Sequence, residues 1–155
     1  MNKHSIFAAC VLLLLVFSSG CLSLQPASSA PSFRTLSFAN ATLSVEMAAT
    51  KAQIETGLMG RTSLGGRSGM LFDMGSGRTA PSFYMYRTLI PLDAIFLDEN
   101  MYVVDIQSMT PCASEDSRAC KIYTSRVPAR YVLEVNAGFA DKNGIKIGDK
   151  ANLKD

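Results

Sequence analysis

The histidine content limits the chemistry that this chain can perform. Its one histidine, His4, lies in an N-terminal segment with the pattern of an export signal, so the mature chain would carry no imidazole. Ser-His-Asp and Cys-His nucleophile arrangements, the usual general base near neutral pH and histidine-containing zinc sites are thereby excluded. The sequence also shows no phosphate-binding loop, dinucleotide fingerprint or EF-hand pattern. We expect no cofactor and no metal, and any catalysis would use carboxylates, Arg, Lys, Tyr or thiols.

Polar side chains at the ends of predicted elements are the first candidates for a site. Asp93 follows Pro91 at the entrance of an apolar strand, where a carboxylate can accept backbone N–H bonds or meet Arg61 or Arg87. Arg61 comes directly after a short predicted helix. We expect Arg61 and Asp93 to lie within an ionic contact or one small-molecule width of each other and, with Thr88, to mark the functional surface. A purely structural ion pair is the alternative.

Aromatic side chains surround Arg87 in the sequence. Phe83, Tyr84 and Tyr86 precede it, and tyrosine faces next to a guanidinium suit a carbohydrate or peptide-like ligand. The first functional hypothesis is therefore a non-enzymatic, membrane-tethered binding domain. The second is a carboxylate-based hydrolase or lyase of envelope polymers, with Asp93 as acid or base and Arg61 stabilising an anion. A structural role in envelope assembly is the third.

The sulfur-containing residues separate by position. Cys10 lies inside the signal, Cys21 at its end, and only Cys112 and Cys120 fall in the folded part. Export places the last two in an oxidising compartment, so we expect them to form a disulfide, with a redox or metal role as the alternative. A Cu(I) site built from Cys112 and several methionines is a further alternative, although methionines on strand-like runs more commonly fill a core. The methionines in question are Met59, Met70, Met74, Met85 and Met109.

The first part of the chain predicts export and a membrane anchor. Residues 1–20 form a signal peptide with an apolar run from Ile6 to Phe17, too short to span a bilayer. Ser18-Ser19-Gly20 before Cys21 resembles a lipoprotein cleavage site, which would leave Cys21 lipidated. Cleavage after Ala30 and an uncleaved anchor are alternatives. Residues 21–33 are rich in Ser, Ala and Pro and predict a flexible tether.

Composition indicates one globular domain, over residues 34–155. The chain is 48% hydrophobic and 18% charged, which is ordinary for a domain with a buried core. Its net charge of +2 comes from 15 basic and 13 acidic residues spread along the length, so no charge block is present to attract a nucleic acid. We expect the membrane and an unknown envelope ligand or protein as partners.

Alternating and short apolar runs predict a mainly β fold. Residues 42–48 alternate as in a half-buried strand, and Thr50 with Gln53 forms a capping box for a short helix that Gly57 and Gly60 limit. Asp98 to Asn100 should form a hairpin loop. Residues 137–143 predict a second short helix, followed by a last strand. A compact β-sandwich or small barrel with one or two short helices follows. The other predicted strands are residues 70–72, 83–86, 94–97, 102–106, 122–123 and 131–135.

Five motifs in order resemble the domain of unknown function 192 family, from about Leu43 to the C-terminus. The resemblance implies a small exported prokaryotic protein with a compact all-β fold, and it implies no assigned activity. The family pattern Phe-Trp-Met-Lys-Asn-Thr is altered here at Tyr84, Tyr86 and Arg87, so a ligand of other members need not be shared. The motifs are Gly57-Leu58-Met59-Gly60-Arg61, Gly69-Met70-Leu71-Phe72, Phe83 to Asp98, Pro111-Cys112 and the segment from Ala129 to Gly138.

Overall fold

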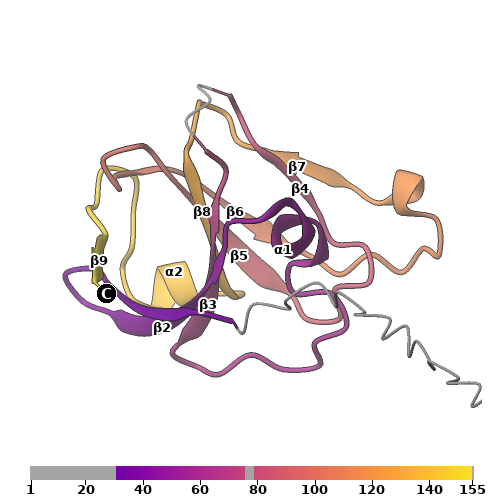
Figure 1. Ribbon diagram of the computed structural model, residues 1–155, viewed down its shortest axis with the longest axis horizontal. Coiled ribbons are helices and arrows are strands. Elements are labelled where there is room, and N and C mark those ends of the chain that lie inside the picture. Colours follow the sequence, from indigo (N-terminus) through magenta and orange to yellow (C-terminus); the bar gives the residue numbers. More distant parts are fainter. Residues whose placement is uncertain (1–30, 76–78, 155) are drawn as a thin grey trace, which may run out of the picture.

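One curled sheet carries most of the chain. The computed structural model describes residues 31–75 and 79–154. Within them, seven strands are ordered β6-β5-β8-β3-β2-β1-β9, and a separate ribbon pairs β4 with β7. Figure 1 shows the sheet curving through the centre, with α1 and the β4–β7 ribbon on one side and α2 near the opposite side. The mainly β fold predicted from the sequence is confirmed. The strands are β1 Phe33–Ser37, β2 Thr42–Ala48, β3 Ser68–Asp73, β4 Ser82–Tyr84, β5 Leu92–Leu97, β6 Val103–Met109, β7 Ile122–Thr124, β8 Tyr131–Asn136 and β9 Asn152–Lys154.

The pairing explains why the centre of the sheet is apolar on both faces. β5 and β8 pair antiparallel, β3 lies antiparallel to β8, and β2 lies parallel to β3. All six residues of β5 are buried, as expected for a strand that is covered on both sides. Because neighbouring residues of a strand point to opposite faces, the central strands serve two hydrophobic cores, one on each face of the sheet.

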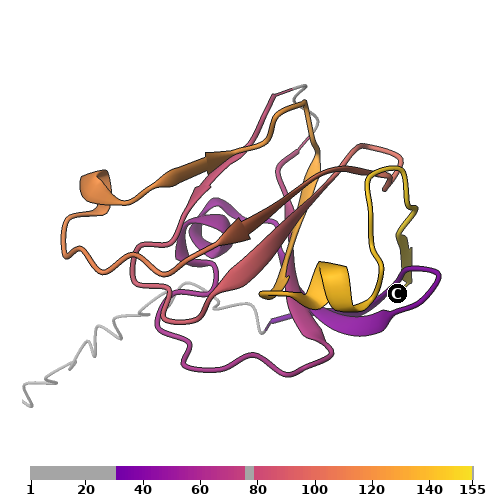
Figure 2. The ribbon, with the colours of Figure 1, turned by 180° about the vertical axis from the view of Figure 1, so that it is seen from behind.

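The first core lies on the face that α2 covers. Leu71, Ile95 and Leu133 come from β3, β5 and β8, and α2 (Phe139–Lys142) adds Phe139 and Ala140. The sequence predicted this helix, although it begins later than residue 137. Strands β1 and β9 bend around this core, and Figure 2 shows them beside α2 from behind.

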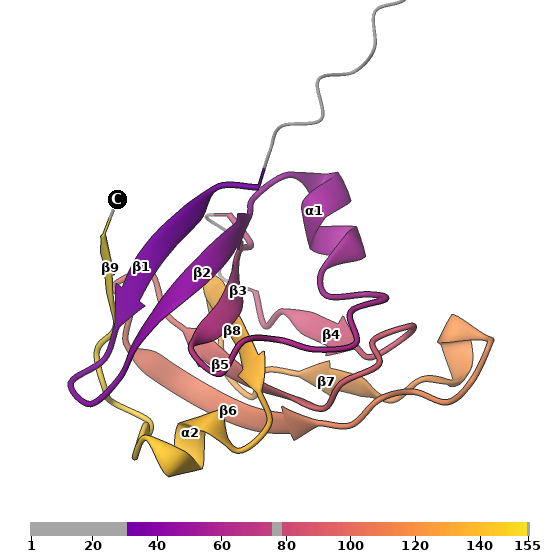
Figure 3. The ribbon, with the colours of Figure 1, turned by 90° about the horizontal axis from the view of Figure 1, so that it is seen from below.

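The second core lies beneath α1 and the ribbon. Phe72, Phe96 and Phe83 meet edge to face, with ring centroids 5.1 Å (Phe72–Phe83) and 6.4 Å (Phe83–Phe96) apart. Helix α1 (Lys51–Thr56) has the predicted capping box: Gln53 N–H donates to the Thr50 hydroxyl, and the Gln53 side chain accepts from the Thr50 N–H. Figure 3 shows α1 and β4 on the same side of the sheet.

Three further local predictions have clear outcomes. Cys112 and Cys120 form a disulfide. The Asp98 carboxylate accepts the N–H groups of Asn100 and Tyr102 in the β5–β6 hairpin, so its role as a turn former is confirmed. Strand β1 begins at Phe33, so the last residue that the sequence assigned to the tether belongs to the sheet. The export signal, Cys21 and most of that tether lie outside the described residues. No helix of the described ranges is long and apolar enough to cross a membrane.

Candidate functional site

Glu134 is the feature that marks a site in this fold. It lies in the middle of β8, in register with Met70 of β3 on one side and Ala94 of β5 on the other. Alternation along β8 directs it to the face of the second core, as Val132 is, and 5% of its surface is exposed. A carboxyl group at this place interrupts an apolar face. A glutamate is among the least expected residues at such a position unless it has a partner.

The Glu134 side chain has no hydrogen-bond or ion-pair partner among the described residues. No side-chain oxygen or nitrogen that is fully sealed from solvent there lacks a partner, so the carboxyl oxygens of Glu134 must reach open space. Burial raises the pKa of this carboxyl to about 8, because the ionised form is poorly solvated. Strongly perturbed titratable groups in cavities are typical of functional sites.

The space that Glu134 reaches is a cavity of about 220 Å³ between the sheet, α1 and β4. We call it the Glu134 pocket. Phe72 and Phe83 form part of its apolar wall, and Tyr84 and Thr88 add polar groups. Its other lining residues are Ile54, Glu55, Thr56, Gly57, Leu58, Met59, Met74 and Ser82. Apolar walls with a few polar groups are the usual character of a small-molecule site.

Two glycines make this arrangement possible. Gly57 ends α1 with φ of +46° and ψ of −132°, and a Cβ there would come within 3.3 Å of the Phe72 ring. This close approach lets the chain turn across the pocket mouth. In β3, a Cβ on Gly69 would lie 2.8 Å from the carbonyl oxygen of Glu134, so only glycine allows β8 to pair so closely at this position. Gly69 thus helps to place Glu134, and Gly57 lets the end of α1 lie against the Phe72 wall of the pocket.

The aromatic cluster expected near Arg87 is present at the edge of the Glu134 pocket. The rings of Tyr84 and Tyr86 are stacked with centroids 6.2 Å apart, and the Arg87 guanidinium lies 5.1 Å from the centre of the Tyr86 ring. Tyr84 lines the pocket directly. Arg87 has a φ of +54°, unusual for a residue with a side chain, and its carbonyl accepts the Gly60 N–H at 2.8 Å.

Thr88 also lines the pocket and is buried. Its hydroxyl lies 3.5 Å from the Tyr86 carbonyl oxygen, at the limit of a hydrogen bond. The hydroxyl oxygen therefore remains able to accept a bond from a ligand. Thr88, Tyr84, Tyr86 and Arg87 are four of the six residues chosen from the sequence, and they gather at one end of this pocket or beside it.

Arg61 and Asp93 do not form the expected pair. Arg61 makes an ion pair with Glu46 instead, next to a neighbouring groove on the second-core face. Asp93 is 2% exposed and accepts bonds from the Ser108 hydroxyl at 2.8 Å and from the Ala140 N–H of α2 at 3.2 Å. Asp93 and Ile95 are two residues apart on β5 and therefore point to the same face, the face of the first core. The prediction of a shared Arg61–Asp93 surface was wrong, because β5 directs Asp93 to the first-core face while Arg61, in the loop after α1, pairs with Glu46 on the second-core face.

The copper site considered above loses its cysteine ligand. Cys112 is committed to the disulfide, and Met70, Met85 and Met109 are buried in the second core, where methionine fills irregular space. Met59 and Met74 do line the Glu134 pocket. Among the described residues, no cluster of three or more Cys, Asp, Glu or His side chains could hold a metal ion.

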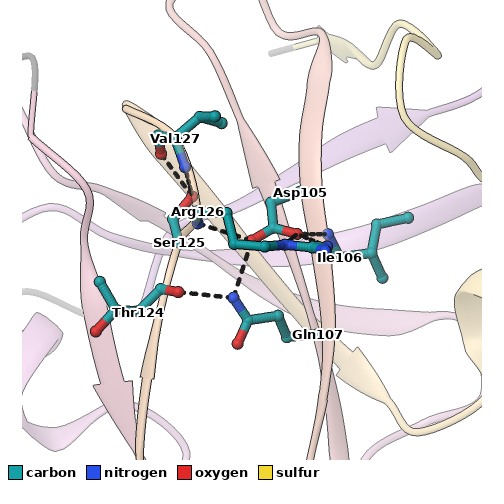
Figure 4. A network of polar contacts seen from close by, with 7 residues as sticks. All are labelled: Asp105, Ile106, Gln107, Thr124, Ser125, Arg126 and Val127. Atoms are coloured by element: carbon teal, nitrogen blue, oxygen red, sulfur yellow. Dashed lines mark hydrogen bonds and ion pairs between the residues drawn. The ribbon is translucent and has the colours of Figure 1, made fainter.

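Asp105 is a second buried carboxyl, and Figure 4 shows how its surroundings satisfy it. It accepts the Ile106 N–H at 2.8 Å, the Arg126 N–H at 3.0 Å and the Gln107 amide at 2.9 Å, and it pairs with the Arg126 guanidinium. Burial pushes its pKa upward, but the bonds from Arg126 and Gln107 outweigh burial and lower the pKa to about 2. This network ties β6 to the segment after β7.

Sequence reasoning missed Glu134, although one signal was available. Residues 131–135 read Tyr-Val-Leu-Glu-Val, an apolar run of the kind that forms a strand buried on both faces, and a single acid in such a run must be enclosed. The run was correctly predicted to be a strand. The sequence around Glu134 does not indicate which elements would enclose it, because α1 and β4 come from distant parts of the chain.

Comparison with known proteins identifies the family. The chain belongs to the DUF192 family, described as "Uncharacterized ACR", whose model matches residues 34–153. A protein from Sinorhizobium meliloti 1021, described as a proposed transcription regulator, is 32% identical with a TM-score of 0.71, over 80% of this chain and 95% of that one. A protein of unknown function from Novosphingobium aromaticivorans DSM 12444 is 32% identical with a TM-score of 0.66, over 83% and 89%. No curated protein matches.

Proposed function

We propose that this protein is a non-enzymatic binding module that takes a small ligand into the Glu134 pocket. The observation that carries the proposal is the unpartnered, buried carboxyl of Glu134, which opens onto a cavity of about 220 Å³. Leaving a polar group without a partner inside a protein costs about 1–3 kcal/mol. In a binding site, the bound ligand supplies the missing partner and offsets this cost.

The size and shape of the pocket favour a small ligand or one slender part of a larger one. The cavity is smaller than the roughly 300–1,000 Å³ typical of drug-sized ligands. Tyr84 is 41% exposed at the edge of the pocket, where its ring can cover the part of a ligand that remains outside. A carbohydrate or peptide-like ligand would use this outer surface.

Binding can be tested by nuclear magnetic resonance with a small-fragment library and isotope-labelled protein. Ligands of the proposed site should shift the backbone signals of Gly57, Phe72 and Tyr84 and lose most of their affinity in Glu134→Gln. The matched control is Asp93→Asn, which changes a buried acid on the opposite face and should leave the affinity unchanged. If no fragment shifts these signals, or if both variants bind as the original protein does, the proposal is wrong.

We also propose that the domain is exported and held at the membrane through Cys21. The sequence pattern before Cys21 supports this, and so does the Cys112–Cys120 disulfide, because disulfides persist in oxidising compartments. Mass spectrometry of the membrane fraction should find a lipid-modified N-terminal Cys21, and Cys21→Ala should release the protein from that fraction. An unmodified N-terminus at Pro31, or an intact Met1, would contradict lipidation.

A carboxylate-based hydrolase is the second candidate, and one observation favours it. Glu134, with a raised pKa, and Glu55, on the exposed face of α1, line the same pocket. Two carboxyl groups lining one space are the usual pair of a glycosidase. Asp93 cannot fill either role, because its carboxylate is used inside the first core. Hydrolysis of aryl glycosides that is lost in both Glu134→Gln and Glu55→Gln would replace the binding-module proposal.

A further inference from the structure

The charged groups around the Glu134 pocket indicate the sign of its ligand. Three titratable side chains line it: Glu134 from β8, Glu55 from α1 and Tyr84 from β4. None of the described residues that line it is a lysine or arginine. Two basic side chains lie beside it: Lys51 pairs with Glu55 at 3.8 Å on the exposed side of α1, and the Arg87 guanidinium packs on the Tyr86 ring. Neither lines the pocket, so an anionic ligand inside it would meet the Glu134 carboxyl without a basic partner.

The walls indicate what the rest of the ligand must be. Phe72 and Leu58 are almost completely buried, and Met59 lines the space beside them. These side chains offer no hydrogen bonds, so a ligand with polar groups along its length would lose hydration without compensation. Polar acceptors are confined to few places, namely the Glu134 carboxyl, the Thr88 hydroxyl and the side chains at the rim.

We propose that the ligand carries a primary ammonium group on a short apolar stem, with the ammonium against Glu134 and the stem along Phe72 and Met59. This inference rests on the proposed binding function. An ammonium group has three donors, which Glu134 and Thr88 can accept. A guanidinium has five donors in a rigid fork, more than these acceptors satisfy. The aromatic rings of Phe83 and Tyr84 add a favourable environment for a cation.

Binding of such a cation must be coupled to a proton. In the free protein at pH 7 the Glu134 carboxyl is mostly protonated, because burial raises its pKa to about 8. Pairing with an ammonium stabilises the carboxylate, so the carboxyl proton passes to the solvent and one ion pair forms. Affinity should consequently rise with pH, by about tenfold per unit well below the pKa, and level off above about pH 8. A neutral ligand that accepts a bond from the protonated acid would show the opposite trend.

The experiment compares n-pentylamine with 1-pentanol, which has the same length and no charge. Both are titrated into the purified protein, with backbone signals of the pocket as the readout of binding. We expect the amine to bind at least about tenfold more tightly at pH 7, as expected for a charge-assisted bond. Calorimetry in two buffers of different ionisation enthalpy should show release of about one proton per amine bound. The blocked amino acid Nα-acetyl-lysine methylamide tells whether a lysine side chain fits as well as a free amine.

Variants separate this inference from the binding proposal. Glu134→Gln should abolish both the preference for the amine and the proton release, whereas Glu55→Gln, on the same pocket, should keep the proton release. Circular dichroism would confirm that each variant is folded, and Thr88→Val, which removes the second acceptor, should weaken the amine more than the alcohol. Equal binding of amine and alcohol, or binding without proton release, would overturn the ammonium assignment while the pocket remained a binding site. If other fragments bind there and the amine does not, the same conclusion holds. If nothing binds there, both proposals fail.

Discussion

Asp105 and Glu134 lie on strands that flank β5, and both are almost fully buried. Asp105 receives hydrogen bonds from two backbone N–H groups and two side chains, and its pKa falls to about 2. Glu134 receives none from the described residues, and its pKa rises to about 8. The same type of group is thus ionised in one place and protonated in the other at neutral pH. Burial alone does not decide the charge of a carboxyl, because the donors around it can reverse the effect of burial.

The comparison also distinguishes a carboxyl group that holds the fold together from one that is available to a ligand. The Asp105 network joins β6 to the chain after β7 and leaves no acceptor for a ligand (Figure 4). Glu134 lies at a cavity and leaves its oxygens available. A fully satisfied buried network holds a fold in one arrangement, whereas an unsatisfied group commonly has a catalytic or binding reason. The predictions below test this division.

The largest effect is expected from Asp105→Asn. The amide keeps the shape but presents an NH₂ group to an environment made of donors, and Asp105 is 0% exposed. Asparagine cannot accept all the bonds that the carboxylate takes from two backbone N–H groups and Gln107, and each buried donor left unsatisfied costs about 1–3 kcal/mol in the free energy of unfolding. The Arg126 guanidinium is 70% exposed and stays solvated, so the loss of the ion pair itself adds little. Urea unfolding measures the total loss. As a control, Asp116→Asn removes an exposed carboxylate that also pairs with an arginine, Arg118, and should have little effect. Similar losses in the two variants would mean that the Asp105 network is not special.

Glu134 should make stability decrease with pH. Its pKa is raised from 4.5 to about 8 on folding, so the folded state holds a proton that the unfolded state releases. The stabilisation is complete below about pH 4.5 and is lost as pH rises toward 8, on the order of 5 kcal/mol for a shift of this size. Glu134→Gln should remove this slope. Asp105 acts in the opposite direction, because its depressed pKa stabilises the fold above about pH 4 and loses that effect as pH falls toward 2. The free energy of unfolding of both proteins is measured from pH 5 to 8. If it changes with pH equally in the original protein and in Glu134→Gln, the raised pKa of Glu134 is contradicted.

Loss of the disulfide should affect stability without affecting either carboxyl. Cys112 and Cys120 close a short loop, for which the loop-entropy model gives about 2–3 kcal/mol. The double variant Cys112→Ala/Cys120→Ala should unfold more easily and keep the pKa of Glu134, since neither cysteine lines its pocket. Finding both thiols free in protein from its native compartment would remove the basis of this prediction.

The smallest effect is expected from Asp93→Asn. The Asp93 carboxylate accepts one bond from Ser108 and one from Ala140, and an amide oxygen can keep one of them. We expect a loss of about 1 kcal/mol and no change in fragment binding. A large loss of binding with unchanged stability would show that Asp93 belongs to the binding site, which contradicts its structural role.

Local signals in the sequence were sufficient for most of the fold. Thr50 with Gln53 specifies the start of α1, and the apolar run after Pro91 specifies β5, because capping and burial act over a few residues. The site required more. Arg61 and Asp93 are both at element ends, but which face each side chain takes depends on the register of strands far apart in the chain. The role of Glu134 could not be predicted for the same reason, because α1 and β4 as well as β8 line its cavity.

Nuclear magnetic resonance titration of the carboxyl carbon of Glu134 tests the central claim most directly. The carboxyl signal is assigned by comparison with Glu134→Gln, and Asp105 in the same spectra provides an internal reference that should remain ionised down to about pH 2. The account predicts a midpoint raised to about 8 in the free protein, and a lower midpoint when n-pentylamine is bound. A midpoint near the ordinary value of about 4.3 for glutamate, unchanged by the amine, would show that Glu134 is already satisfied in the free protein and is not the centre of a binding site.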